Sequence, residues 1–168
     1  MKALANHVLR DHVLFGGVLA AAIFPAFGWT GALAFWASTV LIDLDDYLNF
    51  IVHAQFRVWD PESMFRFHEA LFERRHRSEF LAVEIFHTLE FVALLGLAAF
   101  WKRGILVPIF LGVLVHFVID LIHLARYGIL HKRSISFFEY GWRVRRMRAR
   151  GLDPDVIWRE TLEGAGLR

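Results

Sequence analysis

Cysteine is absent from the 168 residues of the chain. Its absence excludes disulfide bonds and thiolate ligands, so any metal ion must be held by His, Asp or Glu. Internal repeats and low-complexity linkers are also missing, and the length suits a single domain. No small-residue cleavage site follows the first apolar run, so we interpret this run as a retained helix and not as a signal peptide. Neither sign of charge is in excess, because 17 acidic residues nearly balance 19 lysines and arginines.

Hydrophobic residues are what the chain has in excess. They make up 57% of it, with a mean hydropathy of +0.43, whereas a soluble domain is typically about 45–50% apolar. We therefore expect an all-α integral membrane bundle of about four transmembrane helices, with interfacial amphipathic helices. The expected membrane helices are residues 12–27, 31–46, 79–101 and 105–126, and the amphipathic ones are residues 61–77 and 153–162. Residues 1–130, including helix 61–77, form the expected bundle, and residues 131–168 form a basic cytoplasmic tail.

Three polar residues interrupt the most apolar stretch, residues 112–123. Asp120 and His123 follow His116 by four and seven positions, which places all three on one face of a helix. An Asp near the middle of a bilayer costs roughly 2.5–3.5 kcal/mol, which the surrounding Leu, Ile, Val and Phe can offset if the polar face turns inward. Two interpretations stay open at this point: a polar seam that holds helices together, or a metal site inside a membrane protein.

Helices joined by short turns must alternate in direction across the membrane. With this topology, polar residues of all four expected helices fall in one layer on the same side. They are His12 at the start of the first helix, Asp43, Asp45 and Asp46 at the end of the second, Glu84, His87 and Glu90 in the third, and His116, Asp120 and His123 in the fourth. The same side carries most of the arginines. By the positive-inside rule it is cytoplasmic, with both termini there.

Seven of these polar residues lie in four short motifs. They are D-H-V-L-F (residues 11–15), I-D-L-D-D (42–46), F-H-T-L (86–89) and L-G-V-L-V-H-F-V-I-D (111–120). Their order resembles that of the inner-membrane-associated metal-dependent hydrolases, also described as LexA-binding. That family shows an N-terminal His before an apolar helix, then P-D-I-D-H, H-R-G-x-T-H-S and G-Y-x-x-H-x-x-x-D. The chain has Ile42, Asp46 and Ala82 where the family has Pro, His and the His of H-R-G. Glu84 and His76 are the candidates to replace that last His.

The resemblance implies a multi-pass protein of the cell inner membrane, with a metal site whose ligands match the family motifs position by position. They are His12, Asp43, Asp45, His87, His116 and Asp120, and the helical spacing adds His123 as a further candidate. We predict Asp46, Glu84 and Glu90 as the catalytic residues that relay protons. The expected cofactor is a divalent metal ion, with zinc favoured and manganese or iron as alternatives. From the residues alone, a hydrogen-bonded seam, buried satisfied histidines or a solvated helix end remain open.

Three functions compete. The first is a hydrolase in which metal-activated water attacks a phosphoester or acyl ester of a lipid-like substrate at the cytoplasmic face. The second is a di-iron oxygenase or desaturase, indicated by Glu84 with His87 and by Asp120 with His123 at helical spacing. The third is a non-enzymatic metal-binding subunit or carrier.

The expected partners follow from the membrane location. They are membrane lipids and a lipid-like substrate, without nucleic acid. We expect the arginine-rich run of residues 141–150 to serve as a topology signal that contacts lipid headgroups. The oligomeric state stays open.

Overall fold

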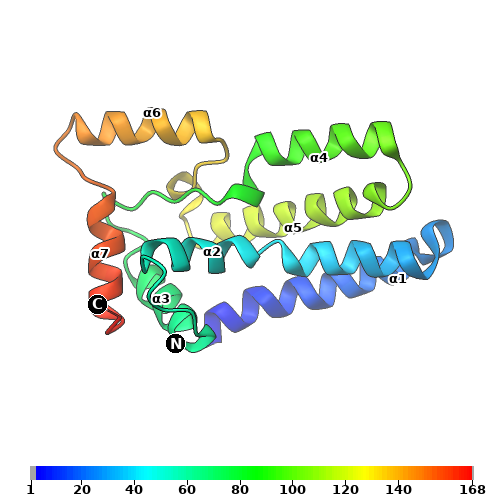
Figure 1. The fold of residues 1–168 in the computed structure, drawn as a ribbon, viewed down its shortest axis with the longest axis horizontal. Coiled ribbons are helices and arrows are strands. Elements are labelled where there is room, and N and C mark those ends of the chain that lie inside the picture. Colours follow the sequence, from blue (N-terminus) through cyan, green and yellow to red (C-terminus); the bar gives the residue numbers. More distant parts are fainter. Residues whose placement is uncertain (1–2, 168) are drawn as a thin grey trace.

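The computed structural model describes residues 3–167, and the side chains of residues 10–167 (Figure 1). Within this part of the chain every regular element is helical and no strand is formed, which confirms the all-α prediction. The elements are α1 (Ala3–Leu41), α2 (Leu44–His53), α3 (Pro61–Glu73), the 3-10 turn η1 (Ile85–His87), α4 (Leu89–Lys102), α5 (Leu106–Arg126), the 3-10 turn η2 (Leu130–Lys132), α6 (Phe137–Arg148) and α7 (Asp155–Gly164). Residues 1, 2 and 168, which belong to the two expected ranges, lie outside the described part.

The first long element, α1, is a hairpin of two helices. Gly28 interrupts it with φ 65° and ψ −173°, a positive-φ conformation that glycine adopts without steric cost. The chain reverses there, and the two legs of α1 run antiparallel, side by side (Figure 1). The Trp36 indole of the second leg donates a hydrogen bond of 3.1 Å to the Val13 carbonyl of the first. The predicted end of the first helix at residue 27 is therefore confirmed.

A second hairpin is formed by α4 and α5. Arg103 and Gly104, both with positive φ, make the turn between them. Helix α5 packs mainly against α1 and then against α4, so the two hairpins lie side by side with their turns at the same end (Figure 1). Gly112 permits the close approach of α5 to α1, because a Cβ atom there would collide with Ser38 Oγ and the Phe35 carbonyl.

The third expected membrane helix begins later than predicted. Helix α4 starts at Leu89, not at residue 79. The preceding segment instead pairs with the chain after η2: Ala82 N–H donates to the Lys132 carbonyl at 3.0 Å, and Ser134 N–H donates to the Ala82 carbonyl at 2.8 Å. Hydrogen bonds to a distant segment thus replace the helical ones, and this is the physical reason for the correction.

Two stretches of the described chain are long and apolar enough to cross a membrane. They are Arg10–His53 and Leu106–Arg126, with mean hydropathies of 1.8 and 2.2. The first stretch contains the turn of the α1 hairpin. Helix α4 has 14 residues, or about 21 Å at 1.5 Å per residue, which is shorter than a hydrocarbon core of about 30 Å.

The amphipathic helix predicted at residues 61–77 is α3, which ends at Glu73. Asp60 caps its start, since the carboxylate accepts a backbone N–H at 2.8 Å. Helix α3 packs with α2 and α7 around a core that includes Phe50, Phe67 and Trp158. Helix α7, which lies in the expected tail, thus packs against helices of the expected bundle.

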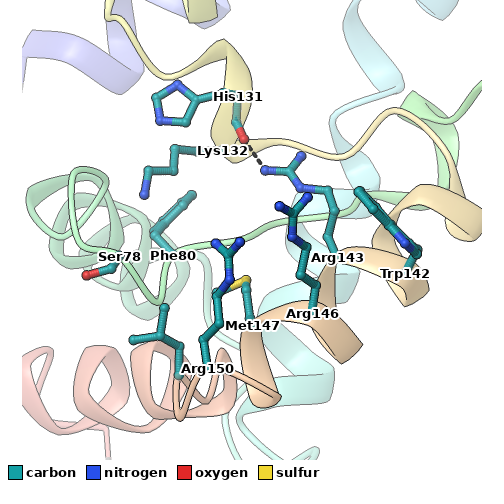
Figure 2. A pocket seen from close by; sticks show the side chains of 10 residues that line it. Ser78, Phe80, His131, Lys132, Trp142, Arg143, Arg146, Met147 and Arg150 are labelled. Atoms are coloured by element: carbon teal, nitrogen blue, oxygen red, sulfur yellow. Dashed lines mark hydrogen bonds between the residues drawn. The ribbon is translucent and has the colours of Figure 1, made fainter.

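The arginine-rich run lies mostly on α6. Ser136 caps this helix, its hydroxyl accepting the Phe138 N–H at 3.2 Å. Arginines of α6 face Phe80 and Lys132 across an open pocket (Figure 2). The basic tail thus forms a defined surface of the folded protein.

Candidate metal centre

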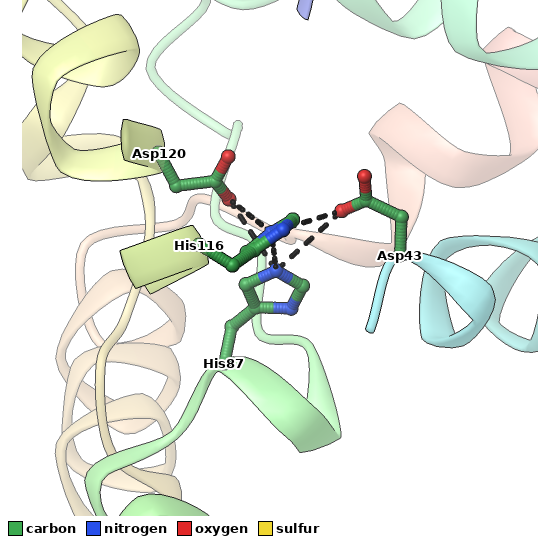
Figure 3. Close-up of side chains that lie close together, drawn as sticks. All are labelled: Asp43, His87, His116 and Asp120. Carbon is green, nitrogen blue, oxygen red and sulfur yellow. Dashed lines mark hydrogen bonds and ion pairs between the residues drawn. The ribbon is translucent and has the colours of Figure 1, made fainter. Parts of the chain in front are cut away.

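Four side chains from separate segments meet at the end of the hairpins opposite their turns. Asp43 lies between α1 and α2, His87 in η1, and His116 and Asp120 on α5. One ligand atom of each lies within 4.8 Å of the others (Figure 3). Asp43 Oδ1 is 3.2 Å from His116 Nε2 and 3.6 Å from His87 Nε2. Asp120 Oδ2 is 3.4 Å from His87 Nε2 and 3.6 Å from His116 Nε2. Together they form what we term the Asp–His cluster.

The two imidazoles of this cluster turn their lone pairs toward each other. His116 Nδ1 lies 2.8 Å from the Thr39 carbonyl, which can only accept, so Nδ1 carries the proton. His87 Nδ1 lies 3.1 Å from the Asp45 carboxylate, which is also an acceptor. The two Nε2 atoms then face each other at 2.8 Å. Two imidazole lone pairs and two carboxylate oxygens converge with no donor between them when both rings are neutral.

Such a set of acceptors fits a divalent cation. With bonds of about 2.0–2.2 Å to nitrogen and oxygen, the ligand atoms of a tetrahedral site lie roughly 3.3–3.6 Å apart. The four Asp–His distances of the cluster are 3.2–3.6 Å. His87 and His116 are 1% and 0% exposed, whereas the Asp43 side chain is 27% exposed. The cluster is therefore largely shielded from water and accessible on the side of Asp43.

His12 lies against the cluster as a fifth member. It is fully buried, and neither of its ring nitrogens has a hydrogen-bond partner among the described residues. Nδ1 is 3.4 Å from Asp43 Oδ2 and Nε2 is 3.3 Å from Asp120 Oδ1. Its ring packs on His116 with 3.9 Å between centroids. His12 thus faces the outer oxygens of both carboxylates, while the other two histidines face the inner ones.

Asp45 orients the cluster from behind His87. Its Oδ2 accepts the Phe86 N–H at 2.8 Å as well as contacting His87 Nδ1. A carboxylate behind a ligating histidine fixes the ring and its tautomer. Asp45 therefore lies on the Nδ1 side of His87, opposite Asp43 and Asp120, and with Glu84 and His87 it forms a second group of possible ligand atoms within 4.8 Å of one another.

Arg133 is the residue of this site that the sequence did not reveal. Its guanidinium is an ion-pair partner of Glu84 and lies 2.7 Å from Asp120 Oδ2. Burial lowers the pKa of Arg133, but a guanidinium stays protonated in proteins. Glu84, a predicted proton relay, also lies 3.5 Å from His87 Nδ1, so it is held between a cation and an imidazole.

Three predicted residues are not brought into the cluster. His123 pairs with Asp11 at 3.4 Å. Glu90 accepts a hydrogen bond of 2.6 Å from the Ser136 hydroxyl at the start of α6 and is not a member of the cluster. Asp46 is half-buried and has no side-chain hydrogen bond or ion pair among the described residues. Glu90 and His123 therefore serve other contacts.

The charge of the site is dominated by carboxylates. Burial on its own lowers the pKa of His87, but the facing Asp43 and Asp45 outweigh burial and hold this pKa well above its ordinary value. In the metal-free protein, a proton on His87 thus partly neutralises the negative charge of the carboxylates. A cation that binds must displace this proton.

Comparisons with models of known protein families, with curated proteins and with solved structures gave no match. The resemblance of the motif order to the inner-membrane-associated hydrolases therefore stays a prediction. What the site can do follows from its own geometry. A buried set of acceptors with one accessible carboxylate can hold a divalent cation and leave a position for water.

Proposed function

We propose that this protein is a membrane-embedded, metal-dependent hydrolase whose cation is held by the Asp–His cluster. The observation that carries the proposal is the convergence of two carboxylate oxygens and, when both rings are neutral, two Nε2 lone pairs on one space. Zinc suits two imidazoles and two carboxylates at this spacing, with manganese or iron as alternatives. Such an ion, when bound, lowers the pKa of water and polarises an ester oxygen.

The surrounding residues of the chain would orient the ligands and handle protons. The Thr39 carbonyl and the Asp45 carboxylate fix the two ligating imidazoles. His12 lies between the outer oxygens of Asp43 and Asp120, so it is placed to hold or pass a proton at either ring nitrogen. Arg133 offsets part of the carboxylate charge and keeps Asp120 in place.

Four membrane crossings are proposed: the two legs of α1, α4 and α5. The support is the pair of apolar stretches and the side-by-side hairpins. Trp29 and Trp101 are 81% and 74% exposed at the turn end, as expected for an aromatic belt at a membrane surface. Local thinning of the bilayer or tilting of neighbouring helices can accommodate the short α4. The arginines at the opposite end favour a cytoplasmic location for the cluster.

An apolar groove between α1 and α5 supports the proposal of a lipid-like substrate. The groove has a volume of about 670 Å³, is lined mostly by aliphatic side chains and ends in Asp11, His123 and Arg126. The His123 ring lies 6.3 Å from that of His12, so the polar end of the groove is next to the cluster. An acyl chain in the groove would bring an ester or phosphoester near the cation site.

The di-iron alternative has less support, because Glu84, a member of the second group of possible ligands with Asp45 and His87, is engaged by a cation. Glu84 pairs with Arg133, and Asp45 accepts the Phe86 N–H. Glu84 and His87 precede α4 and do not form a helical pair. A single cation is therefore the better fit to the residues present.

The test is hydrolysis by the purified, zinc-loaded protein in mild detergent. Substrates are p-nitrophenyl phosphoesters and acyl esters, together with phospholipids. We expect turnover that is lost on chelation and in His116→Ala, and kept in Arg145→Gln, an exposed residue of α6. Failure of the loaded protein to cleave any member of the panel would contradict the proposal, and an oxo-bridged iron absorbance would favour the oxygenase.

A further inference from the structure

A second charged site lies outside the Asp–His cluster, where α6 faces the segments that precede and follow the α4–α5 hairpin (Figure 2). It is an open pocket of about 450 Å³, within the range of small-molecule sites. Lys132, Arg143, Arg146 and Arg150 line it, and none of its lining residues is acidic. The pocket is therefore positive on all its charged sides.

The arginines of α6 reach this pocket because of their spacing. Arg143, Arg146 and Arg150 are three and four positions apart, which places them on one face of the helix and its continuation. The side chains of Arg146 and Arg150 have no hydrogen bond or ion pair among the described residues. The guanidinium of Arg146 lies 5.4 Å from the centre of the Trp142 ring, a cation–π contact that leaves its N–H donors available.

The other two cations are held in place from behind. Arg143 donates to Glu139 Oε1 at 3.0 Å and to the His131 carbonyl. Lys132 donates to the Arg77 carbonyl at 2.6 Å. Burial and the nearby charge of Arg143 lower the pKa of Lys132, so like charges are crowded together here. Two fixed cations and two with available donors surround one space, and a bound anion would relieve their repulsion.

We propose that this pocket binds a phosphate-bearing anion. Guanidinium groups match phosphate oxygens with paired N–H donors, and a lysine adds a compact positive charge. Phe80, Trp142 and Met147 form an apolar wall that can contact the organic part of a phosphorylated ligand. The ligand is either a free phosphorylated compound or the headgroup of an anionic lipid. The site stands independently of the proposed hydrolase, because it shares no residue with the Asp–His cluster.

Calorimetric titration of the full-length protein in a nonionic detergent tests the proposal. One arm uses pyrophosphate and inorganic phosphate. The other uses short-chain phosphatidic acid, with short-chain phosphatidylcholine as its neutral counterpart. The pocket variant is Arg146→Gln with Arg150→Gln. The matched control is Arg145→Gln with Arg57→Gln, which removes the same charge from exposed positions that do not line the pocket.

We expect binding by the natural protein that weakens at least about tenfold in the pocket variant and less than twofold in the control. Higher salt should also weaken it. Binding of pyrophosphate identifies a free phosphorylated ligand, and binding of phosphatidic acid alone identifies a headgroup site. The helical circular dichroism and melting temperature of the pocket variant should match those of the control, which shows that it is folded. No binding in either arm, an equal loss in both variants, or preferential binding of a short RNA would overturn the proposal.

Discussion

The Asp–His cluster and the basic pocket are both built from charged side chains, but they differ in burial and origin. The cluster draws mostly buried residues from distant parts of the chain, and its carboxylates face histidines and one arginine. The pocket takes most of its charge from exposed arginines along one helix. Buried charges must be paired or bind an ion, whereas exposed charges are stabilised by water. The fold therefore depends on the first site and tolerates changes in the second.

Removal of the cation should have the largest effect. A ligand present at about a thousand times its dissociation constant stabilises the folded state by roughly 4 kcal/mol, which corresponds to a shift on the order of 10 °C in melting temperature. We expect EDTA to lower the melting temperature of the zinc-loaded protein by this amount, measured by differential scanning fluorimetry. The Arg146→Gln, Arg150→Gln variant should respond equally and His116→Ala should not. An unchanged melting temperature after chelation would contradict the claim that the Asp–His cluster, unlike the basic pocket, binds a stabilising cation.

Neighbouring residues 132 and 133 allow a direct comparison of the two sites. Arg133 is buried against Asp120 and Glu84, while Lys132 lines the basic pocket. Breaking a buried ion pair costs about 3 kcal/mol, so Arg133→Gln should lower the free energy of unfolding by that amount, measured by thermal unfolding in detergent. Lys132→Gln should cost less than about 1 kcal/mol. Equal free energies of unfolding for the two variants would show that the buried site contributes no more to stability than the exposed one.

Asp45 and Asp46 form a second matched pair. Asp45 orients His87 through Nδ1, and loss of such a partner typically weakens metal binding by about 10–100-fold. Competition with a zinc-binding dye should show this loss in Asp45→Asn. Asp46→Asn, next to it in the chain but without a side-chain hydrogen bond, should stay within about threefold. A greater loss of zinc affinity in Asp46→Asn than in Asp45→Asn would show that Asp46, and not Asp45, orients His87.

The smallest expected effect concerns the start of α4. The Thr88 hydroxyl accepts the Phe91 N–H at 3.3 Å as the N-cap, next to the cluster, whereas Ser78 lines the basic pocket. Replacing an N-cap by alanine costs about 1 kcal/mol. We expect this loss for Thr88→Ala and almost none for Ser78→Ala, both measured by thermal unfolding. A larger loss for Ser78→Ala would support the earlier helix start that the sequence predicted.

The sequence predicts the cluster because its signal is local. His116 and Asp120 share a helix face by spacing alone, and short turns bring Asp43 and His87 to the same end of the hairpins. His123 lies on the same face of α5, but seven residues at 1.5 Å each place it about 10 Å from His116 along the helix axis. It is therefore too far along α5 to join the cluster.

Arg133 and the start of α4 could not be predicted in this way. Both depend on the pairing of residue 82 with residues 132–134, which are far apart in the chain. Such pairing has no periodic pattern in either segment. Once it forms, it draws Arg133 toward Asp120 and keeps His87 off the helix, and Glu90 contacts the tail at Ser136 instead of the cluster.

Elemental analysis of the full-length protein, purified in mild detergent without added metal and alongside His116→Ala and Asp120→Ala, tests the central claim most directly. The account predicts about one tightly bound divalent cation per natural chain, and close to none in either variant, with helical circular dichroism retained. A natural protein without bound metal, or variants that retain it in full, would contradict the claim that Asp43, His87, His116 and Asp120 hold one ion.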